Sequence, residues 1–483
     1  MSRDYDIIIL GSGPAGFSCA MQSSKFDKKA LIVEPNESNL GGTWINTGTI
    51  PSKAFREATK TILAFNNQFH DETDAKPYEH YRMKDLLQYK DDILEHENRK
   101  VKNDIKKNKV DIARGFGHLV NNHTVKVKSE TGSVKTYTAD YLLICTGSRP
   151  APPDSFPIED TEILNYESIL NLTHIPRRLA IIGNGVHTME YATIFAALGT
   201  RVYVLNKKED HLPFLDNEIK QHFFDIISDS IRIHNDIDID KIKFNAFRSY
   251  TEVHFKDKKD ADRKQVVETE HVLSLGGRQP NTENLELENV QVKTDENGFI
   301  ITDDCYQTSV ENIYAAGDVI GFPRLVSASF SQGRHAACNM FGIPAQESAQ
   351  QIPYGIYSIP EISRIGLTER EAKNNGYKVT VGRAFFKDIA KADMLNQQNG
   401  LLKLVFDTET FQLLGVHIVG DEASNLIHLG QSVLAFEGDV RYFIRHVMNY
   451  PTLSEAYRIA AFNGMNRVYQ GGVQHREIWN DNA

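Results

Sequence analysis

The feature that most constrains the fold is a glycine-rich turn near the start of the chain. Residues 5–10 read YDIIIL, an apolar run typical of a strand buried in a parallel sheet. The motif GSGPAG follows at residues 11–16, and a helix is expected over 17–26. A second short strand over 30–33 ends in Glu34. A strand, a glycine turn, a helix, a second strand and an acid, in this order, predict a dinucleotide-binding βαβ unit.

Each position of this turn has a physical role. Gly11 allows the tight turn, Gly13 lets the backbone approach a pyrophosphate, and Gly16 lets the helix pack on the strand. The N-terminus of the helix favours the phosphate charge, and the acid can accept hydrogen bonds from a ribose. We therefore expect the nucleotide to contact Gly11, Gly13, Pro14, Ala15, Gly16 and Glu34.

A second unit of the same kind spans residues 179–205. Its turn is Gly183-Asn-Gly185, so both glycines are expected to approach a second dinucleotide. The third glycine position holds Thr188, although a small residue is preferred where helix and strand meet. The branched side chain must displace something, and the sequence leaves open whether this impairs the site.

The residues after this unit bear on the choice of nucleotide. Asn206 stands where an NAD site usually has an acid, and Lys207 and Lys208 come next. An acid would repel the 2′-phosphate of NADP, so its absence permits NADP, and lysines can hold the phosphate as point charges. We expect Asn206 and Lys207 to contact the nucleotide. The alternative is a solvated loop.

The remaining pattern divides the chain into an α/β part and a C-terminal α+β part. In the first part we expect long polar helices over 54–108, an antiparallel ribbon over 115–140, a strand over 141–145 and a hairpin over 250–275. In the second part we expect strands over 378–386, 401–406 and 413–419 and helices over 421–436 and 453–462. The predicted domains are 1–155 together with 278–350, then 156–277, then 351–473, followed by a polar tail, 474–483.

Composition excludes several classes of function. The 483 residues are 41% hydrophobic and 24% charged, as in ordinary soluble globular enzymes. The net charge of −10 argues against a nucleic-acid partner. No apolar run approaches the roughly 18 residues of a membrane span, and the first residues lack the apolar run of a signal peptide. We therefore expect a cytoplasmic protein with no membrane partner.

The cysteine positions exclude an obvious redox or metal motif. No two of them stand at a CxxC or CxxxxC spacing, so neither a redox pair nor a metal site is predicted. We expect all of them to fill the apolar interior: Cys19, Cys145, Cys305 and Cys338.

The stretch GGTWINTGTIPSK at residues 41–53 carries a resemblance to a known family. Its frame resembles the active-site loop of the flavoprotein disulfide reductases, which reads Gly-Gly-Thr-Cys, four residues, Cys, then Ile-Pro-Ser-Lys. Trp44 and Thr49 occupy the two cysteine positions here. A helix is expected to begin at Pro51, because proline suits a first helical turn.

Further motifs occur in the family order and extend the resemblance from about Asp4 to Tyr469. The resemblance implies FAD bound by the first unit, NAD(P) bound by the second, and a C-terminal dimerisation domain that pairs two subunits so that each helps to build the other's active site. It implies further cofactor contacts at Gly42, Thr43, Lys53, Gly117, Thr146, Gly147, Glu190, Gly277, Arg278, Gly317, Asp318 and Ser327.

Lys53 and Glu190 match the family pair that lies beside the flavin N5, and the resemblance makes them the catalytic residues. A lysine there favours the reduced, negatively charged flavin, and the glutamate orients and balances it. The alternative is a buried structural salt bridge. Hydride transfer between nicotinamide and flavin needs no protein acid or base, only two rings held roughly 3–3.5 Å apart.

Within the family the chain is most similar to the soluble FAD-dependent pyridine nucleotide transhydrogenases. They share the GTIPSK run that ends at Lys53 and the Asn449-Tyr450-Pro-Thr run, where disulfide reductases have a His-Pro base. A dithiol cycle needs two sulfurs and a base, and Trp44, Thr49 and Tyr450 supply none of them. Reduction of a disulfide substrate is therefore excluded.

Three functions remain open from the sequence. The first is a transhydrogenase, the second an NAD(P)H oxidase or quinone reductase, and the third a non-catalytic FAD-binding dimer whose nicotinamide site Thr188 has closed. Trp44 is expected to stack near the flavin or to plug the old substrate channel. Tyr450 is expected to form a structural hydrogen bond with Glu455, and His187 is expected to be incidental.

Overall fold

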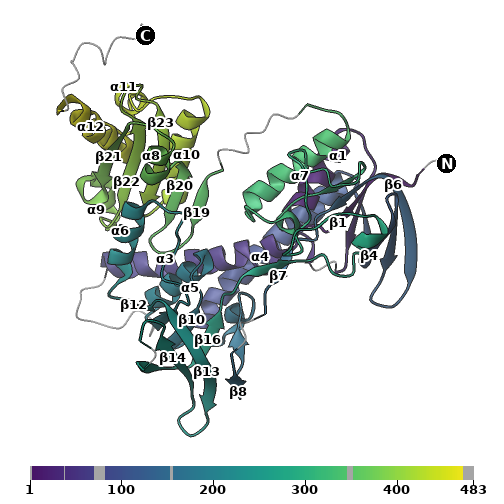
Figure 1. Ribbon diagram of the computed structural model, residues 1–483, viewed down its shortest axis with the longest axis horizontal. Helices are drawn as coiled ribbons and strands as arrows, with labels where there is room; N and C mark the ends of the chain where they lie inside the picture. The colour runs from purple at the N-terminus through teal and green to yellow at the C-terminus, as the bar shows by residue number, and fades with distance from the viewer. Residues whose placement is uncertain are drawn as a thin grey trace.

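The computed structural model describes residues 3–36, 39–69, 82–152, 156–260, 262–344 and 352–470. Within these ranges the chain forms three lobes, which Figure 1 shows at the right, the bottom and the upper left. The first lobe surrounds the sheet of β1, the second surrounds the sheet of β10, and the third holds the sheet of β19 to β23. The predicted tail, 474–483, lies outside the described residues.

The first lobe is built on a parallel sheet whose centre is the predicted strand at the start of the chain. Its strand order is β3-β2-β1-β6, with β18 beside β6. The bounds are β1 Tyr5–Leu10, β2 Ala30–Glu34, β3 Asp111–Arg114, β6 Val134–Ile144 and β18 Ile313–Ala315. Ile7 pairs with Ala30 on one side and Tyr141 on the other. Both faces of β1 are covered, which explains its unbroken apolar run.

Two helices lie against one another in this lobe, α1 (Pro14–Lys25) and α7 (Val326–Met340). The helix α1 begins at Pro14 rather than at Phe17, because proline is accommodated at the first helical position. The two helices approach so closely that a Cβ built on Gly333 would lie 1.9 Å from the carbonyl oxygen of Ala15. Glycine is therefore required at this crossing.

The ribbon expected over 115–140 and the strand expected over 141–145 are joined in one strand, β6. Its first half pairs antiparallel with β5 (Thr124–Lys128), which pairs with β4 (Phe116–Asn121). Its second half enters the core and pairs parallel with β1 and β18. No turn residue interrupts residues 134–144, so the polar half and the buried half stay in one extended segment.

The second lobe holds the second glycine turn between a parallel sheet and helix α5 (Val186–Ala197). The sheet has the order β12-β11-β10-β16-β9, with β9 Ile163–Leu164, β10 Arg178–Ile182, β11 Arg201–Leu205, β12 Ile231–His234 and β16 His271–Ser274. A second, four-stranded sheet lies beside it, with β8 Ile158–Glu159, β13 Ile237–Asn245, β14 Tyr250–Asp257 and β15 Lys264–Thr269. In it β8 pairs parallel with β13, and the other pairs are antiparallel.

The hairpin expected over 250–275 is shorter than predicted. Strands β14 and β15 do pair antiparallel, but β16 leaves the hairpin and pairs parallel with β10. The reason is burial: Val272 and Leu273 enter the core of the parallel sheet, whereas the hairpin is amphipathic. A two-stranded connection, β7 (Ser148–Pro150) with β17 (Arg278–Pro280), returns the chain to the first lobe.

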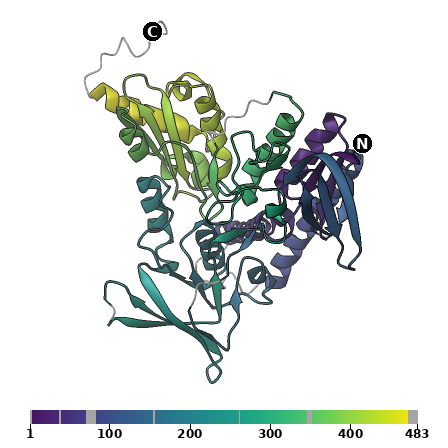
Figure 2. The same cartoon turned by 45° about the vertical axis from the view of Figure 1, so that its right-hand side comes forward.

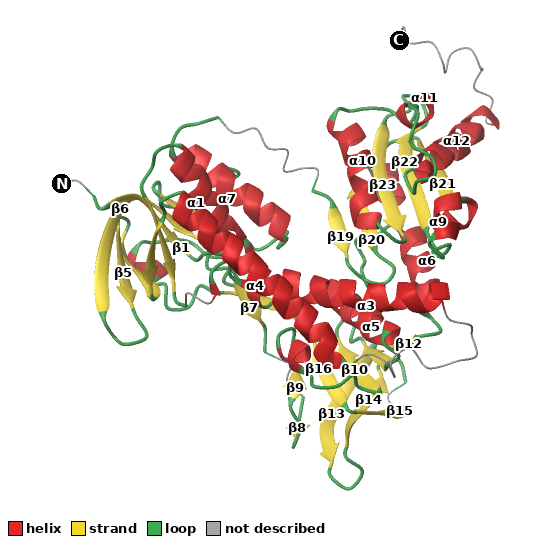
Figure 3. Ribbon diagram, turned by 180° about the vertical axis from the view of Figure 1, so that it is seen from behind, coloured by secondary structure: helices red, strands yellow, loops and turns green. Residues whose placement is uncertain are grey.

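The long helices expected over 54–108 are α3 (Thr49–Phe69) and α4 (Met83–Lys107). The short helix α2 (Thr43–Asn46) precedes them. Helix α3 begins at Thr49 rather than Pro51, so the proline lies in its first turn, where no intrahelical hydrogen bond needs its missing N–H. Figure 3 shows α3 running between the third lobe and the second.

The third lobe is the expected α+β unit, an antiparallel sheet with its helices outside it (Figure 3). Its order is β19-β20-β23-β22-β21, with β19 Tyr354–Ile356, β20 Ile362–Gly366, β21 Val379–Phe385, β22 Leu401–Asp407 and β23 Leu413–Val419. Helix α10 contacts β20 and β23, and α12 contacts β21 and β22. The helices are α8 Glu369–Asn374, α9 Ala390–Met394, α10 Ala423–Ala435, α11 Tyr442–Arg445 and α12 Glu455–Gln470.

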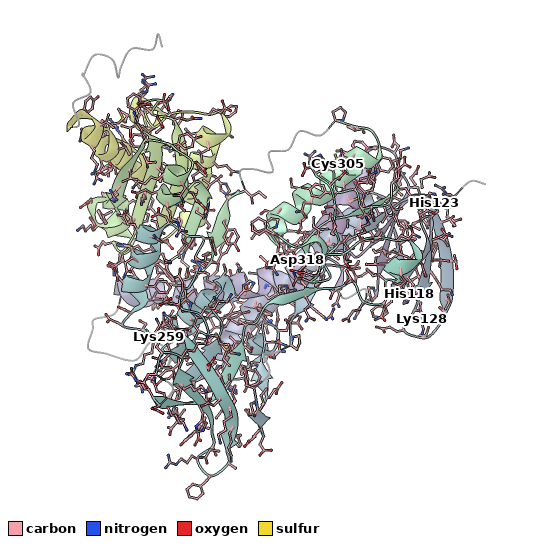
Figure 4. All side chains as sticks on the ribbon, viewed as in Figure 1. His118, His123, Lys128, Lys259, Cys305 and Asp318 are labelled. Atoms are coloured by element: carbon pink, nitrogen blue, oxygen red, sulfur yellow. The ribbon has the colours of Figure 1, made fainter. Side chains whose placement is uncertain are left out.

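The cysteines follow the prediction with one exception. Cys19, Cys145 and Cys338 are buried, but Cys305 is exposed. It lies in a surface turn in which its backbone N–H donates to the carboxylate of Asp303, and Figure 4 labels it at the edge of the first lobe.

Within the described ranges, none of the helices has the length and apolar character of a membrane span. In the same ranges no cluster of His, Cys, Asp or Glu could hold a metal ion.

A buried lysine joins the second lobe to the third. The side chain of Lys403 on β22 is 2% exposed, and its Nζ lies 3.0 Å from Asp216 and 3.1 Å from Glu218 of the second lobe. Glu369 of the third lobe is 2.7 Å away. Asp216 also accepts from the N–H of Glu218 and so caps helix α6 (Asn217–Ile227). Burial opposes ionisation of Asp216, but His417 and Lys403 hold its pKa below the usual value.

Thr188 lies in the first turn of α5, which is an unbroken helix. It is fully buried, and the Cβ that Gly183 lacks would lie 2.5 Å from its Oγ1. Among the described residues this hydroxyl has no hydrogen-bond partner. The threonine therefore takes the space above the glycine turn and leaves a buried polar atom unsatisfied.

Lys403→Met should destabilise the protein by about 3–5 kcal/mol at pH 7, because it leaves the buried carboxylate of Asp216 without its cation. The pKa values of Asp216, Glu218 and Glu369 are all lowered in the folded state. Their contribution is therefore present above about pH 4 and is lost as the pH falls through the lowered values. Denaturant unfolding of both proteins between pH 3 and 7 measures this. A gap between them that stays constant with pH would contradict the ion-pair account.

Gly183→Ala should cost about 1–3 kcal/mol, because the new methyl meets Thr188 and the backbone φ of +153° disfavours a side chain. Thr188→Ala should stay within about 1 kcal/mol of the wild type, since it removes an unsatisfied hydroxyl together with a methyl group. The double variant should then be less destabilised than the sum of the two. Thermal unfolding of the three variants tests the contact, and strict additivity would refute it.

Candidate active site

A cleft of about 1540 Å³ lies where the three lobes meet. Figure 2 shows this junction from a second angle, with the second lobe below and the third lobe at the upper left. The cleft is lined by many of the predicted residues: Gly11, Gly13, Pro14, Ala15, Glu34, Gly42, Thr43, Lys53, Gly117, Thr146, Gly147, Glu190, Arg278, Gly317, Asp318 and Ser327. The predicted residues outside its lining are Gly16, Gly183, Gly185, Asn206, Lys207 and Gly277.

The first glycine turn forms one wall of the cleft by close backbone contact. A Cβ on Gly11 would lie 2.6 Å from the carbonyl oxygen of Cys145, and Gly11 has a φ of +108°. A Cβ on Gly16 would lie 2.1 Å from the carbonyl oxygen of Gly11. A Cβ on Gly13, by contrast, would meet nothing within 4 Å. The turn is therefore closed on its protein side and open at Gly13, as the approach of a pyrophosphate requires.

Ser12 ties this turn to the predicted acid and to the loop at residues 41–53. Its N–H and its hydroxyl donate to Glu34 Oε2 at 3.1 and 2.6 Å, and the hydroxyl accepts from the N–H of Gly41 at 3.1 Å. Burial raises the pKa of Glu34. No sequence signal selects Ser12, because any small residue fits between the glycines.

The loop itself lies against the turn. Gly42 has a φ of +63°, and a Cβ there would lie 3.1 Å from the Cα of Gly13. On the opposite side, Asp318 accepts from the hydroxyl of Ser148 at 2.7 Å and lies 3.8 Å from Nε of Arg278. Asp318 lines the cleft, and Figure 4 labels it near the middle of the view.

The cleft is long enough for an extended ligand. His118 and Lys128, from β4 and β5, line it together with Asp318. Figure 4 places those two residues at the outer part of the first lobe, well apart from Asp318. The cleft volume also exceeds the roughly 300–1,000 Å³ of a typical small-molecule pocket. The glycine turn, the acid and the length together fit a dinucleotide cofactor such as FAD.

Lys53 and Glu190 come together although they lie far apart in the sequence. The Nζ of Lys53 is 3.0 and 2.9 Å from the two carboxylate oxygens, and the Glu190 side chain is 3% exposed. Glu190 also accepts from the N–H of Tyr357 in the third lobe at 2.9 Å. Burial opposes ionisation of Glu190, but Lys53 and His187 hold its pKa well below the usual range.

His187, which was expected to be incidental, contacts Glu190: its Nδ1 lies 3.1 Å from Oε2, and its ring lines the cleft. The residue is three positions before Glu190 on α5, so both side chains project from one helix face. This spacing is visible in the sequence and could have indicated the contact. Tyr166, Tyr354 and Tyr357 also line the cleft and carried no sequence signal.

Trp44 lies behind the wall of the cleft, against Phe330, which lines it. It packs edge-on against Phe330 and Phe17, with ring centroids 4.8 and 5.9 Å apart, and it is not among the residues that line the cleft. The indole ring packs in the apolar space between α1 and α7. Thr49, by contrast, lines the cleft.

Tyr450 does not form the expected hydrogen bond with Glu455. It is 71% exposed, and no bond joins it to Glu455 within the part of the chain that the structure describes. The phenol therefore projects from the surface of the third lobe and is available to a partner rather than to its own chain.

Asn206 is turned into the second lobe. It is 1% exposed, donates to Asn235 at 3.1 Å and accepts from the N–H of Lys208 at 2.9 Å. The side chain is thus enclosed by protein atoms rather than presented to a ligand. Lys207 lies with Nζ 5.2 Å from the ring centre of Phe156. Glu209, two residues after Lys207, pairs with Lys259. Figure 4 shows Lys259 well apart from Asp318.

Family models match most of the chain. Residues 5–333 match the model described as pyridine nucleotide-disulphide oxidoreductase, and residues 352–461 match the model of its dimerisation domain. The soluble pyridine nucleotide transhydrogenase of Marinomonas sp. (strain MWYL1) is 37% identical over 481 residues, which cover 97% of this chain and 100% of the relative. That of Pseudomonas aeruginosa (strain LESB58) is 37% identical over 470 residues, 96% and 99% of the two chains.

Solved structures share the fold at lower identity. The HOCl-induced flavoprotein disulfide reductase RclA of Escherichia coli superposes with a TM-score of 0.84 at 23% identity, covering 95% of this chain and 99% of its own. LpdA of Mycobacterium tuberculosis gives 0.84 at 22%, covering 94% and 98%. The chain therefore belongs to the pyridine nucleotide-disulphide oxidoreductases, a family of oxidoreductase enzymes with FAD- and NAD(P)-binding α/β domains and a dimerisation domain.

Proposed function

We propose that this protein transfers hydride between NADPH or NADP and NAD or NADH through FAD, without a redox disulfide. FAD occupies the cleft of the first lobe, and the nicotinamide nucleotides bind in turn at the second lobe. The observation that carries the proposal is the Lys53–Glu190 pair, which faces the cleft at the junction of both lobes. The transhydrogenases at 37% identity point to the same reaction.

The residues of the first lobe fit FAD in length and in chemistry. Gly13 would approach the pyrophosphate, Glu34 a ribose hydroxyl and Asp318 a ribityl hydroxyl. The flavin ring would then lie toward Lys53, which we propose as catalytic together with Glu190. Bound there, FAD supplies the two-electron chemistry by accepting a hydride from one nicotinamide and giving it to another.

The protein contributes a fixed charge beside the flavin ring. Lys53 places a positive charge beside the ring that gains negative charge, and a preoriented charge in a site shielded from water stabilises more than one in solvent. Glu190 holds the ammonium in place, since it bonds Nζ through both oxygens. The ion pair has a structural value as well, but its position on the cleft favours the catalytic role.

The proposed reaction uses no thiol. Trp44 and Thr49 stand at the positions that resemble the two redox cysteines, and neither side chain can form a disulfide. Tyr450 stands where the family has a histidine base, and a phenol lacks the basic ring nitrogen of a histidine. The protein would therefore pass electrons only between the ring and a second cofactor.

The third lobe supports a homodimer. Phe436, Val447 and Tyr450 on its surface are 88%, 93% and 71% exposed. Exposed apolar side chains gathered on one domain are typical of an interaction surface. Residues 352–461 match a dimerisation domain, so we propose that a second copy covers them.

The purified protein should be yellow, and anaerobic addition of either NADPH or NADH should bleach its flavin absorbance. Steady-state rates with both nucleotides should give parallel double-reciprocal lines, because one cofactor leaves before the other binds. Bleaching is followed in a spectrophotometer. Intersecting lines, rapid aerobic consumption of NAD(P)H without a second nucleotide, or a failure of both nucleotides to bleach would each overturn the proposal.

Lys53→Met should slow anaerobic bleaching about 10²-fold, since it removes the charge beside the ring. Lys53→Arg keeps the charge and should lose much less, which separates an electrostatic effect from a folding defect. Lys60→Met is the matched control, because Lys60 lies on the same helix but pairs with Asp421 outside the cleft. Stopped-flow absorbance gives the rates. Equal rates for Lys53→Met and the control would remove Lys53 from the mechanism.

A further inference from the structure

His187 is half-exposed in the cleft, although it is bonded to a buried carboxylate. Its side chain is 48% exposed, whereas that of Glu190 is 3% exposed. The imidazole packs edge-on against Tyr166, with ring centroids 5.3 Å apart. One edge of the ring is thus fixed by Glu190, and the ring is oriented by Tyr166 toward the space at the junction of the lobes.

The bond to Glu190 decides which ring nitrogen carries the proton. A carboxylate only accepts hydrogen bonds, and the pKa of Glu190 is held well below the usual range. Nδ1 of a neutral His187 must therefore carry the hydrogen, which leaves Nε2 as an acceptor. Within the described residues Nε2 makes no hydrogen bond, since the contacts of this side chain are those to Glu190 and Tyr166.

The two oxygens of Glu190 are already engaged. One Glu190 oxygen accepts from Lys53 and from the N–H of Tyr357, and the other accepts from Lys53 and His187. The ammonium of Lys53 can only donate. Nε2 of His187 therefore stands beside the ion pair as an acceptor that no described residue uses.

We propose that Nε2 of His187 accepts a hydrogen bond from the carboxamide NH2 of a bound nicotinamide and so fixes the orientation of its ring. This inference rests on the proposed function, because the nicotinamide must approach the flavin ring that Lys53 adjoins. Productive transfer needs the two rings within roughly 3–3.5 Å and aligned. A primary amide has both a carbonyl and an NH2 group, so an acceptor in the protein distinguishes its two ends and selects one ring orientation.

The test compares NAD with 3-acetylpyridine adenine dinucleotide, in which a methyl replaces the NH2 and the carbonyl remains. Binding of each oxidised nucleotide to the FAD-loaded protein at pH 8.5 is measured by the perturbation of the flavin absorbance, so no turnover is required. The wild type should bind the amide about three- to tenfold more tightly, the range of one neutral hydrogen bond.

His187→Leu removes the acceptor and should bring this ratio close to one, while His187→Gln supplies a carbonyl acceptor and should restore part of it. His174→Leu is the matched control, because His174 is also an exposed histidine next to a glutamate, Glu270, but lies outside the cleft. It should leave the ratio at the wild-type value. Thermal unfolding of each variant reports whether it is folded.

Two results would overturn the inference. The first is an equal affinity of the wild type for both nucleotides, and the second is a ratio that His187→Leu does not change. A histidine that only supports Glu190 would weaken both nucleotides equally and give that second result. If NADH and NADPH both fail to bleach the wild-type flavin, the proposed function itself fails. If they bleach it and the ratio does not depend on His187, only the inference fails.

Discussion

The ion pair between Lys53 and Glu190 is the interaction on which the arrangement of the lobes depends. Lys53 comes from α3, and Glu190 comes from α5 of the second lobe and accepts the N–H of Tyr357 from the third. A buried carboxylate is costly unless it is paired and hydrogen-bonded. All three lobes must therefore be docked before this charge is satisfied, and the same docking creates the cleft.

Other buried charges reinforce this docking at separate points. Arg56, one turn beyond Lys53 on α3, is 1% exposed and bonds Glu361 and the carbonyl of Ser358 in the third lobe. Lys403 links the third lobe to the second through Asp216. Each lobe is thus fixed to its neighbours by a charge that cannot be exposed without leaving a partner uncompensated. A site built on such contacts keeps its geometry, which a transfer between two stacked rings requires.

Local patterns in the sequence predicted the elements well where one constraint acts on one segment. The glycine turn at residues 11–16 has close backbone contacts at Gly11 and Gly16 that tolerate no side chain, so the motif and the structure agree. Prediction failed where packing between segments decided the outcome. The strand β6 runs through a predicted boundary, and β16 leaves a predicted hairpin, because each enters a core formed by strands distant in the sequence.

The sequence alone determined the two dinucleotide units, the α+β third lobe and the identity of many residues at the cleft, because periodicity and glycine turns act over short stretches. The tertiary structure alone decided the burial and the contact partners of individual side chains. It buried Asn206 in bonds to Asn235, packed Trp44 against Phe330 and brought His187 onto Glu190. The physical reason is that most partners of a side chain come from segments far apart along the chain, and folding, not sequence order, selects among them.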